Sequence, residues 1–405
     1  MTNNQDTKQG AKENQDKKDV KKVNKDKGKK VEKKKFSRKM LLILLSIFII
    51  CLGGFLWYSR SVIWCLADSD CRVNLYNIGF CFLKDCSQDQ DSFESLDDSK
   101  DKEEPEEEKQ VESPLSGVYM TDEEKAFRWP IAVMIENHID SRPHMGLNKA
   151  DLVIEALAEG AITRFVAFYE SEDAETIGPI RSARAYFLDW ISAFDPLLSH
   201  AGGSKLALRL IPQYGLKDMG YRATFRSSKR YAPHNLFSST KSLWEEGNKL
   251  YKTSSKSPIF KSWKYKEDLE EIGDLKDVEQ IKVNFGSYKS YNPVWTYNVE
   301  ENTYLRSYAS GKKHMDSLFD TQISAKNVVV CILQTWIRDR VHKSMQTIGS
   351  GKCYVFLDGK VVVGTWEKKS RKERMRFYDG KGKEIELNRG RTWVEVLPHY
   401  GEIEY

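Results

Sequence analysis

The sequence predicts an α+β fold, in which one N-terminal transmembrane helix precedes a mixed α/β domain and then a mostly β domain. Three observations lead to this prediction. Residues 40–58 form 19 consecutive positions without a charge, about the length that spans the hydrocarbon core of a bilayer. Between residues 125 and 255, short apolar runs alternate with stretches of helical periodicity. From residue 281 onward, apolar runs are separated by Gly and Asp turns, which is typical of strands.

The 40–58 stretch is interpreted as an uncleaved membrane anchor. Residues 1–39 hold 15 basic and 6 acidic side chains, a net charge of +9, and such a flank stays on the cytoplasmic side. Trp57 and Tyr58 lie where an aromatic belt forms at the far interface. A cleaved signal peptide and a buried core helix are the alternatives, but the basic region is long for a signal peptide and no A-x-A-like site follows closely. We therefore expect a single-pass cell-membrane protein with a cytoplasmic N-terminus and residues 59–405 outside.

Three segments around the anchor are expected to lack an apolar core. Residues 1–39 are predicted to be a disordered cytoplasmic tail, whose lysines either rest on anionic lipid or only enforce topology. Residues 59–87 form a neck with four cysteines, which indicates a disulfide-stapled module rather than zinc, because no histidine lies nearby: Cys65, Cys71, Cys81 and Cys86. Residues 88–124 are expected to be a disordered acidic stalk, since 88–112 holds 12 acidic side chains and 3 lysines. The overall net charge of +5 hides this asymmetry, which argues against a cytosolic protein with one globular body.

The remaining chain is expected to form two domains, 125–255 and 281–405, joined by a lysine-rich loop over 256–280. The first domain is predicted to contain a strand, a hairpin, a helix, a strand and a second helix: 131–135, 151–159 with 162–169, the helix that carries Phe187, Trp190, Ile191 and Phe194, then 196–200 and 205–211. The second is predicted to be built from eight strands: 283–285, 294–297, 304–308, 327–333, 353–357, 361–366, 375–378 and 392–397. Cys331 and Cys353 fall in two of these strands, either as buried thiols or as one bridge.

Two turns in the first domain precede helices. Ser182 follows Gly178 and Pro179 and is expected to cap the helix after it. The sequence HAGGS at 200–204 combines a strand end, a Gly-Gly-Ser turn and a helix start. Because backbone N–H groups at a helix start are unpaired and the helix dipole is positive there, this second turn is a candidate anion site.

Several motifs of the outer region resemble the YerB-like family of bacterial envelope lipoproteins, a family of unknown function. They are AVMIENH at 132–138, TRF at 163–165, IGPIRSAR at 177–184, HAGGS at 200–204, APHNL at 232–236, HMD at 314–316, AKNV at 325–328, GSGK at 349–352 and TWVEV at 392–396. The resemblance covers roughly residues 125–400 and implies a two-domain architecture and an extracytoplasmic address, but no reaction. One departure concerns the lipobox: Cys51 follows Phe48, Ile49 and Ile50, which are too bulky for a lipid-modified cleavage site. We therefore expect the helix to replace the lipid as anchor.

Polar residues of the first outer domain are the candidates for a binding site. Four of the seven histidines lie in its motifs, with arginines, acids and amides that are costly to bury unpaired. In the first hypothesis Arg164, Arg181 and Arg184 grip an anion, because guanidinium groups bind carboxylate and phosphate bidentately. The expected partners are the cell membrane and an anionic envelope ligand, namely a cell-wall peptide or a phosphorylated glycan. The predicted ligand-binding residues are Glu136, Asn137, His138, Arg164, Arg181, Arg184, His200, Gly202, Gly203, Ser204, His234 and Asn235.

The same residues allow two other interpretations of the site. Arg164 and Arg181 could instead pair internally with Glu155 and Glu159 and hold the sheet together. In a hydrolase, His200 or His234 would be the general base, Glu136 or Glu159 its partner, and Ser182 or Ser204 a nucleophile. The sequence has neither a G-x-S-x-G elbow nor an H-E-x-x-H zinc helix, so catalytic residues are not assigned and catalysis is left open.

A third class of function is a structural or protein-interaction module. Its partner surface would use tryptophans of the second domain, although most of these are expected in the core: Trp295, Trp336, Trp366 and Trp393. Nucleic acid is not an expected partner, because the basic run at 368–376 is placed outside the cell. No cofactor and no metal site are expected, because the spacing of His138, His144 and Asp151 is not that of a recognised metal motif and proves nothing.

Overall fold

The computed structural model describes residues 110–253, 260–269, 275–339 and 342–405. The predicted tail, anchor and neck, most of the stalk and parts of the connecting loop lie outside the described residues. Across these four ranges, no helix is both long enough and apolar enough to cross a membrane. The anchor at 40–58 and the bridges among Cys65, Cys71, Cys81 and Cys86 therefore stay predictions.

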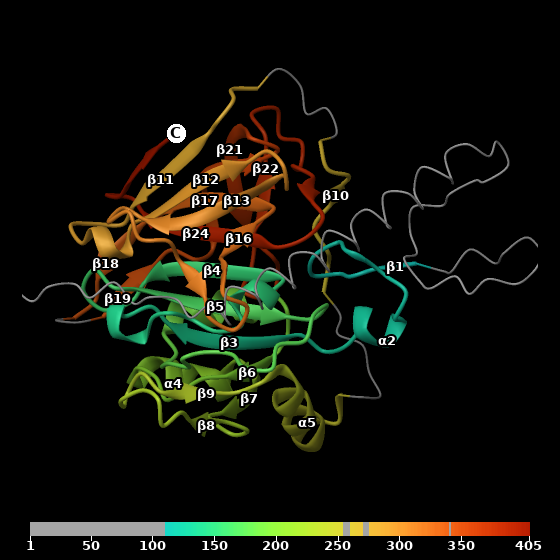
Figure 1. Ribbon diagram of the computed structural model, residues 1–405, viewed down its shortest axis with the longest axis vertical. Coiled ribbons are helices and arrows are strands. Elements are labelled where there is room, and N and C mark those ends of the chain that lie inside the picture. Colours follow the sequence, from blue (N-terminus) through green and yellow to red (C-terminus); the bar gives the residue numbers. More distant parts are fainter. Residues whose placement is uncertain (1–109, 254–259, 270–274, 340–341) are drawn as a thin grey trace, which may run out of the picture. The chain divides into compact units, whose positions relative to one another are not determined.

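A ten-stranded mixed sheet dominates the described region (Figure 1). Its strands come from both predicted domains, which meet where β24 (Thr392–Pro398) pairs in parallel with β4 (Leu152–Leu157). The sheet therefore runs through both regions without a break. In spatial order the strands are β22 (Arg376–Tyr378), β21 (Lys360–Lys368), β20 (Gly349–Leu357), β17 (Asn327–Leu333), β24, β4, β5 (Thr163–Tyr169), β3 (Ile131–Glu136), β6 (Leu197–Ser199) and β7 (Lys217–Gly220).

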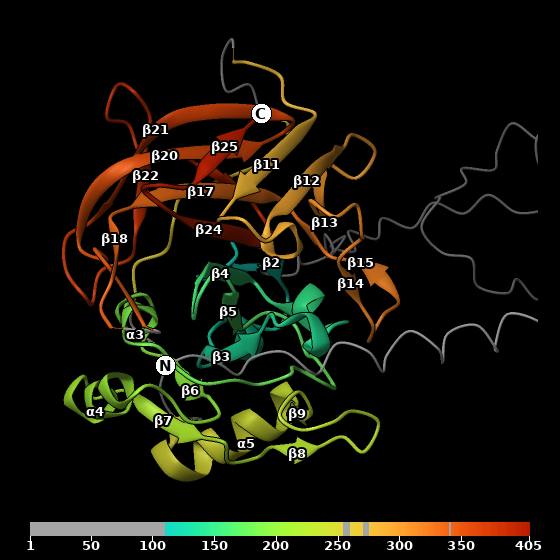
Figure 2. The same cartoon turned by 90° about the vertical axis from the view of Figure 1, so that its left-hand side faces the viewer.

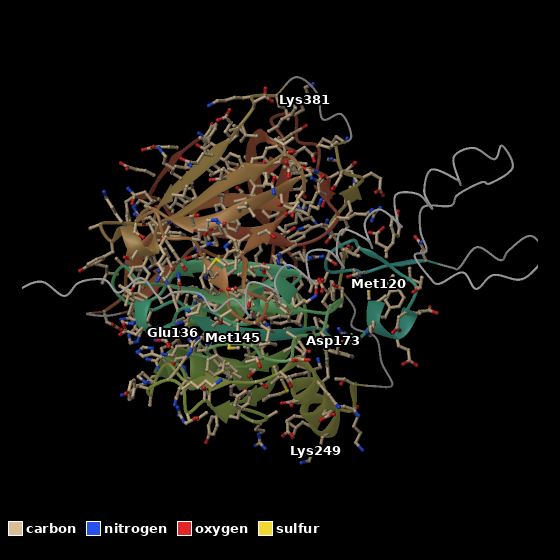
Figure 3. All side chains as sticks on the ribbon, in the orientation of Figure 1. Met120, Glu136, Met145, Asp173, Lys249 and Lys381 are labelled. Carbon is tan, nitrogen blue, oxygen red and sulfur yellow. The ribbon has the colours of Figure 1, made fainter. Side chains whose placement is uncertain are left out.

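The middle strands of this sheet follow from the apolar runs. Every residue of β3 and β5 is buried, because both strands have neighbours on either side and are covered on both faces. The predicted hairpin is confirmed, since β4 and β5 pair antiparallel with Leu157 opposite Thr163. This register places Glu136, the last residue of β3, opposite Arg164 at one end of the strand pair. Figure 3 shows Glu136 at that end and Asp173 at the other.

A second sheet and several two-stranded ladders complete the strands. The five-stranded sheet has the order β16 (Ser324–Ala325), β13 (Thr303–Tyr308), β12 (Pro293–Asn298), β11 (Gln280–Asn284) and β25 (Glu402–Glu404). Burial alternates along β13, as expected for a strand with one face in the core. The ladders are β1 (Val111–Glu112) with β2 (Tyr119–Met120), β8 (Phe225–Arg226) with β9 (Leu236–Phe237), β10 (Tyr265–Lys266) with β23 (Leu387–Asn388), β14 (Met315–Asp316) with β15 (Thr321–Gln322), and β18 (Thr335–Ile337) with β19 (Lys343–Met345).

The helices of the described region are short and few, so the mixed, strand-rich class expected from the sequence is observed. The α-helices are α2 (Glu123–Ala126), α3 (Ala185–Ile191), α4 (Lys205–Gln213) and α5 (Thr240–Tyr251), and the 3₁₀ turns are η1 (Ile139–Ser141), η2 (Leu147–Lys149) and η4 (Lys289–Tyr291). Helix α5 packs on β3, β6 and β7, and Figure 2 shows α4, α5 and β7 to β9 gathered at this end of the sheet.

The expected caps of two helices have different outcomes. Ser204 caps α4 as expected, because its hydroxyl accepts the N–H of Ala207. The expected cap at Ser182 is wrong: Arg184 occupies the N-cap position of α3, and the Ser182 hydroxyl instead donates to the carbonyl of Ala201 at 2.8 Å.

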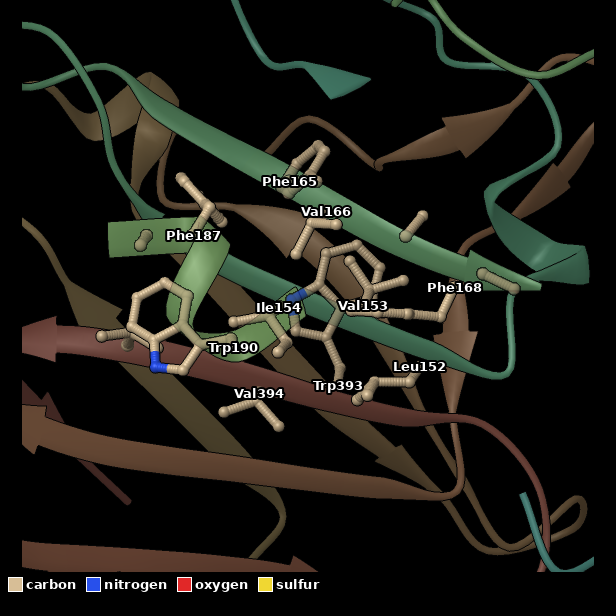
Figure 4. Packing of buried hydrophobic residues seen from close by; sticks show 14 of the residues in the cluster. Leu152, Val153, Ile154, Phe165, Val166, Phe168, Phe187, Trp190, Trp393 and Val394 are labelled. Carbon is tan, nitrogen blue, oxygen red and sulfur yellow. The ribbon is translucent and has the colours of Figure 1, made fainter. Parts of the chain in front are cut away.

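A continuous apolar core packs along the large sheet, and Figure 4 shows the part of it around β4, β5 and β24. Trp393 of β24 packs edge-on against Phe165 of β5, with ring centroids 5.3 Å apart. The two predicted domains, 125–255 and 281–405, therefore share one core. Trp295, Trp366 and Trp393 are all buried, whereas Trp336 is half exposed on β18. Cys331 and Cys353 face each other across β17 and β20 as buried free thiols.

Candidate functional site

A groove of about 480 Å³ is the candidate binding site. Three segments line it: 180–181, 201–202, and parts of 221–236. The first two run side by side, since Ala201 N–H donates to the Arg181 carbonyl at 3.0 Å. Arg181 N–H in turn donates to the Met134 carbonyl, which fixes the floor of the groove to the edge of β3. The Arg181 segment of the groove is therefore hydrogen-bonded directly to the large sheet.

Glu136 organises the polar end of this groove. Its carboxylate forms an ion pair with Arg181 Nε at 3.1 Å and accepts a hydrogen bond from His234 Nδ1 at 2.9 Å. The Glu136 side chain is only 5% exposed, whereas that of Arg181 is 30% exposed and lines the groove. Within the described part of the chain, no residue contacts the two terminal nitrogens of Arg181 by a hydrogen bond or ion pair. We call Glu136, Arg181 and His234 the Glu136 cluster; its arginine is held in place and still has donors for a ligand.

The opposite wall of the groove is aromatic and basic. Tyr221 is 70% exposed and Phe225 50% exposed, and both line the groove beside Arg226. Asn235 positions Arg226, because its Oδ1 accepts from Arg226 Nη1 at 2.6 Å. Arg230 fastens the same loop by donating to backbone carbonyls of residues 141 and 143, both at 2.6 Å.

Two other predicted arginines lie in a separate, closed cluster. Arg164 Nη2 donates to Glu159 Oε2 at 3.1 Å, its Nη1 donates to the Ser182 carbonyl, and Arg184 pairs with the second oxygen of Glu159. Burial lowers the pKa of Arg164 to about 10 and also lowers the pKa of Arg184. We call Glu159, Arg164 and Arg184 the Glu159 cluster. Its Arg164–Glu159 pair is one part of the internal pairing that the sequence left open, whereas Arg181 pairs with Glu136 and not with Glu155 or Glu159.

The 200–204 turn is held in place by contacts within the fold. Both ring nitrogens of His200 face acceptors, namely the Gly202 carbonyl at 2.7 Å and Asp218 Oδ1 at 3.0 Å. Burial alone would raise the pKa of Asp218, but the hydrogen bond and charge of His200 hold it below its usual value. Ser204 N–H donates to the Ala183 carbonyl and Gly203 bridges to Ala183, so this turn is tied to the Arg181 segment. Of these residues, Gly202 reaches the groove.

Asn137 points away from the groove into a buried polar network between residues of the two predicted domains, 125–255 and 281–405. Its amide donates to Thr163 Oγ1 at 2.7 Å, and its Oδ1 accepts from Arg142 Nε at 3.1 Å. Arg306 lies at the centre of the network, fully buried, and donates to Glu155 Oε2 at 2.5 Å. The neighbouring Glu395 is also buried, and burial raises the pKa of its carboxyl well above the usual value.

A directed chain of hydrogen bonds leads from Arg306 to the backbone of Glu136. Arg306 can only donate, so His314 Nδ1 accepts from it and His314 Nε2 donates to His144 Nδ1 at 2.7 Å. His144 Nε2 then donates to the Glu136 carbonyl at 2.6 Å. Both rings are therefore neutral, and burial lowers the pKa of each well below its usual value. This chain stiffens the strand end that carries the Glu136 carboxylate.

One group of side chains near the groove could hold a metal ion. His138, Asp140 and His234 each offer a ligand atom within 4.8 Å of the other two. His138 and His234 stack with ring centroids 5.1 Å apart, and Asp140 lies on the η1 turn directly after His138.

Sequence reasoning missed the aromatic wall of the groove. Tyr221 lies in a turn, and Phe225 and Arg226 form the two-residue strand β8, which is too short to leave a periodic pattern in the sequence. The signal that was present is compositional: YRATFRSSKRY at 221–231 combines three aromatic and four basic residues.

Together these features define a class: an α+β protein in which two regions share one sheet and one buried polar network, with a charged groove at a sheet edge. The chain belongs to the YerB-like family. Residues 115–253 match "Protein of unknown function (DUF3048) N-terminal domain", and residues 281–394 match the corresponding C-terminal domain.

Two comparisons with individual relatives agree with this assignment. The Bacillus subtilis (strain 168) protein described as "Putative lipoprotein YerB" is 30% identical over 309 residues, which is 73% of this chain and 88% of that protein. The crystal structure of YerB from Bacillus subtilis matches with a TM-score of 0.64 and 26% identity, covering 73% of this chain and all of the solved chain. The relative's description as a lipoprotein is consistent with an envelope-associated protein.

Proposed function

We propose that this protein is a membrane-anchored extracytoplasmic protein of the bacterial cell envelope that binds an anionic ligand in the groove. The ligand class is a cell-wall peptide or a phosphorylated glycan, because carboxylate and phosphate both suit guanidinium donors. Arg181 and Arg226 supply the charge, and Tyr221 and Phe225 supply apolar faces for the uncharged parts of the ligand.

The observation that carries the proposal is that Arg181 is paired with Glu136 through Nε while its terminal nitrogens have no partner among the described residues. Glu136 fixes this side chain through Nε, which leaves its two terminal nitrogens as parallel donors at the groove. A pre-oriented fork loses little conformational freedom when a carboxylate or phosphate binds. The Glu159 cluster offers no such donors, because Arg164 and Arg184 are largely buried and paired.

The test is equilibrium binding of the full chain, solubilised in detergent, to two probes: soluble peptidoglycan peptides and poly(glycerol phosphate). The double variant Arg181→Lys with Arg226→Gln removes the fork and the second cation while keeping a charge beside Glu136. We expect at least a 10-fold loss of affinity for whichever probe binds, with little change in the thermal midpoint. Equal affinity of wild type and variant for both probes would overturn the proposal.

Hydrolysis is the second candidate function, and one observation favours it. His234 is hydrogen-bonded to the buried Glu136, which is the pairing of a general base with an orienting carboxylate. Against a serine nucleophile, Ser182 and Ser204 both use their hydroxyls to hold the local backbone. Incubating the full chain with the same probes and measuring their masses separates binding from reaction: new fragments that vanish in His234→Gln would establish catalysis.

The topology is part of the proposal. The uncharged stretch 40–58 and its basic flank support a single-pass anchor, and the four cysteines of 59–87 support a disulfide-linked neck outside the cell. Protease added to intact cells should digest residues 59–405, and the neck thiols should resist alkylation until a reductant is added. A protected outer region or fully reduced neck thiols would contradict this topology.

A further inference from the structure

His138, Asp140 and His234 converge from two segments nearly a hundred positions apart in the chain. One potential ligand atom of each lies within 4.8 Å of the other two. In a tetrahedral site with bonds of about 2.1 Å, ligand atoms lie roughly 3.4 Å apart, so closure around an ion needs a shift of roughly 1 Å. His138 Nδ1 and Asp140 Oδ2 already lie 3.4 Å apart, and their side chains are 37% and 71% exposed, which leaves room for this adjustment.

Glu136 supplies the second, independent feature of a metal site. A histidine that binds a metal usually donates its other ring N–H to a carboxylate, which fixes the ring and raises its basicity. His234 Nδ1 lies 2.9 Å from the buried Glu136 Oε2, and this leaves Nε2 of His234 for the ion. The carboxylate behind it is itself held by Arg181 at 3.1 Å, so the ring has a rigid support.

We infer that His138, Asp140 and His234 bind a divalent first-row transition metal ion, with Glu136 as the carboxylate that orients His234. Two imidazoles and one carboxylate select zinc and its neighbours over magnesium or calcium, which prefer oxygen ligands alone. Three protein ligands leave at least one coordination position open. Water or an anionic group can occupy that position.

Ring stacking and turn capping do not account for the whole arrangement. The cap uses only His138, whose Nδ1 accepts the Asp140 N–H at 3.3 Å. Stacking at 5.1 Å brings two imidazoles together but requires neither the Asp140 carboxylate nor the buried acid behind His234. A metal site uses all four residues at once.

The test is zinc binding by the full chain in detergent, after chelator treatment and without any wall ligand. Bound zinc per chain is counted by mass spectrometry, and the thermal midpoint is recorded with and without Zn²⁺. Wild type should bind one more zinc ion per chain than His234→Ala or Asp140→Asn, and only wild type should show the zinc-dependent rise in midpoint that this site produces. Glu136→Gln should keep the site but weaken it about 10- to 100-fold.

Any zinc held by the cysteine-rich neck contributes equally to wild type and variants, so it cancels when their zinc contents are compared. His342→Ala is the matched control, because His342 is another partly exposed histidine paired with an aspartate, Asp339, and is not in the cluster. Asp140→Asn is the variant least able to disturb folding, since its side chain is mostly exposed. Equal zinc content and equal affinity in wild type, His234→Ala and Asp140→Asn would overturn the inference, whatever the outcome of the wall-ligand experiments.

Discussion

The Glu136 and Glu159 clusters each pair a glutamate with arginine, yet the structure exposes their arginines to different degrees. In the Glu159 cluster the carboxylate takes both Arg164 and Arg184, whose side chains are 6% and 12% exposed. In the Glu136 cluster the acid is the buried member and Arg181 is 30% exposed, with terminal nitrogens at the groove. The comparison shows that an arginine keeps accessible terminal nitrogens when its carboxylate partner is buried and its own side chain is not.

The largest expected effect is on the stability of the closed cluster. Arg164→Ala leaves Glu159 with one partner and empties a buried position, and breaking such a pair costs roughly 3 to 5 kcal/mol. Chemical denaturation of the full chain in detergent measures this loss. Lys249→Ala is the control: Lys249 forms an exposed pair with Glu246, and its loss should stay within about 0.5 kcal/mol. A similarly small effect of Arg164→Ala would mean that the Glu159 cluster is not closed.

The next effect concerns a buried carboxylate without an arginine on its side-chain oxygens. Glu170 Oε2 accepts from Ser113 Oγ at 2.7 Å and from Leu115 N–H at 2.9 Å, and burial raises its pKa to about 8. The folded state therefore holds a proton that the unfolded state releases, so stability falls as pH rises from the unfolded pKa of 4.5 toward 8.

The amide side chain introduced by Glu170→Gln cannot ionise. The variant therefore does not lose stability at this position as the pH rises. Between pH 6 and pH 8 the wild type should lose roughly 2 to 3 kcal/mol relative to the variant, at about 1.4 kcal/mol per pH unit. Denaturation of both proteins at each pH gives the difference, in which all other titrating groups cancel. If the difference in unfolding free energy between wild type and variant stayed constant across this range, Glu170 would be ionised in the folded state. A buried carboxylate would then remain charged without a cation beside it.

A smaller effect is expected at the aromatic wall of the groove. Arg226→Ala should weaken binding of the anionic probe about 5-fold, the equivalent of one charge-assisted contact of about 1 kcal/mol. Arg222→Ala is the matched control, because Arg222 is exposed four positions away and does not line the groove. If both variants weaken binding equally, the wall contributes only general positive charge.

Much of the fold was predictable because burial leaves a direct trace in sequence. The runs at 131–135 and 327–333 became fully paired strands, and the turn at Gly160 separated the hairpin arms as expected. The union of both regions in one sheet was not predictable, because β4 and β24 pair across about 240 residues and no local pattern encodes that register. The Ser182 cap failed because a tertiary hydrogen bond to Ala201 competed for the hydroxyl.

The candidate site was predictable in residue type but not in grouping. The motif at 177–184 drew attention to Arg181 and Arg184 together, yet only the packing around them shows that one opens to a groove and the other is enclosed. Asn137 shared a motif with Glu136 but, because successive side chains along an extended chain alternate in direction, it enters the interior network. Exposure is a tertiary property, and a single sequence does not record it.

The most direct test of this account is the paired comparison of Arg181→Lys and Arg184→Lys, the same conservative change three positions apart. Lysine keeps the charge but loses the fork. For the anionic probe that the wild type binds, Arg181→Lys should lose at least 10-fold in affinity with an almost unchanged unfolding free energy, whereas Arg184→Lys should retain affinity and lose about 1 kcal/mol or more of stability. Equal affinities in the two variants, or a loss of binding confined to Arg184→Lys, would contradict the assignment of the Glu136 cluster to the ligand.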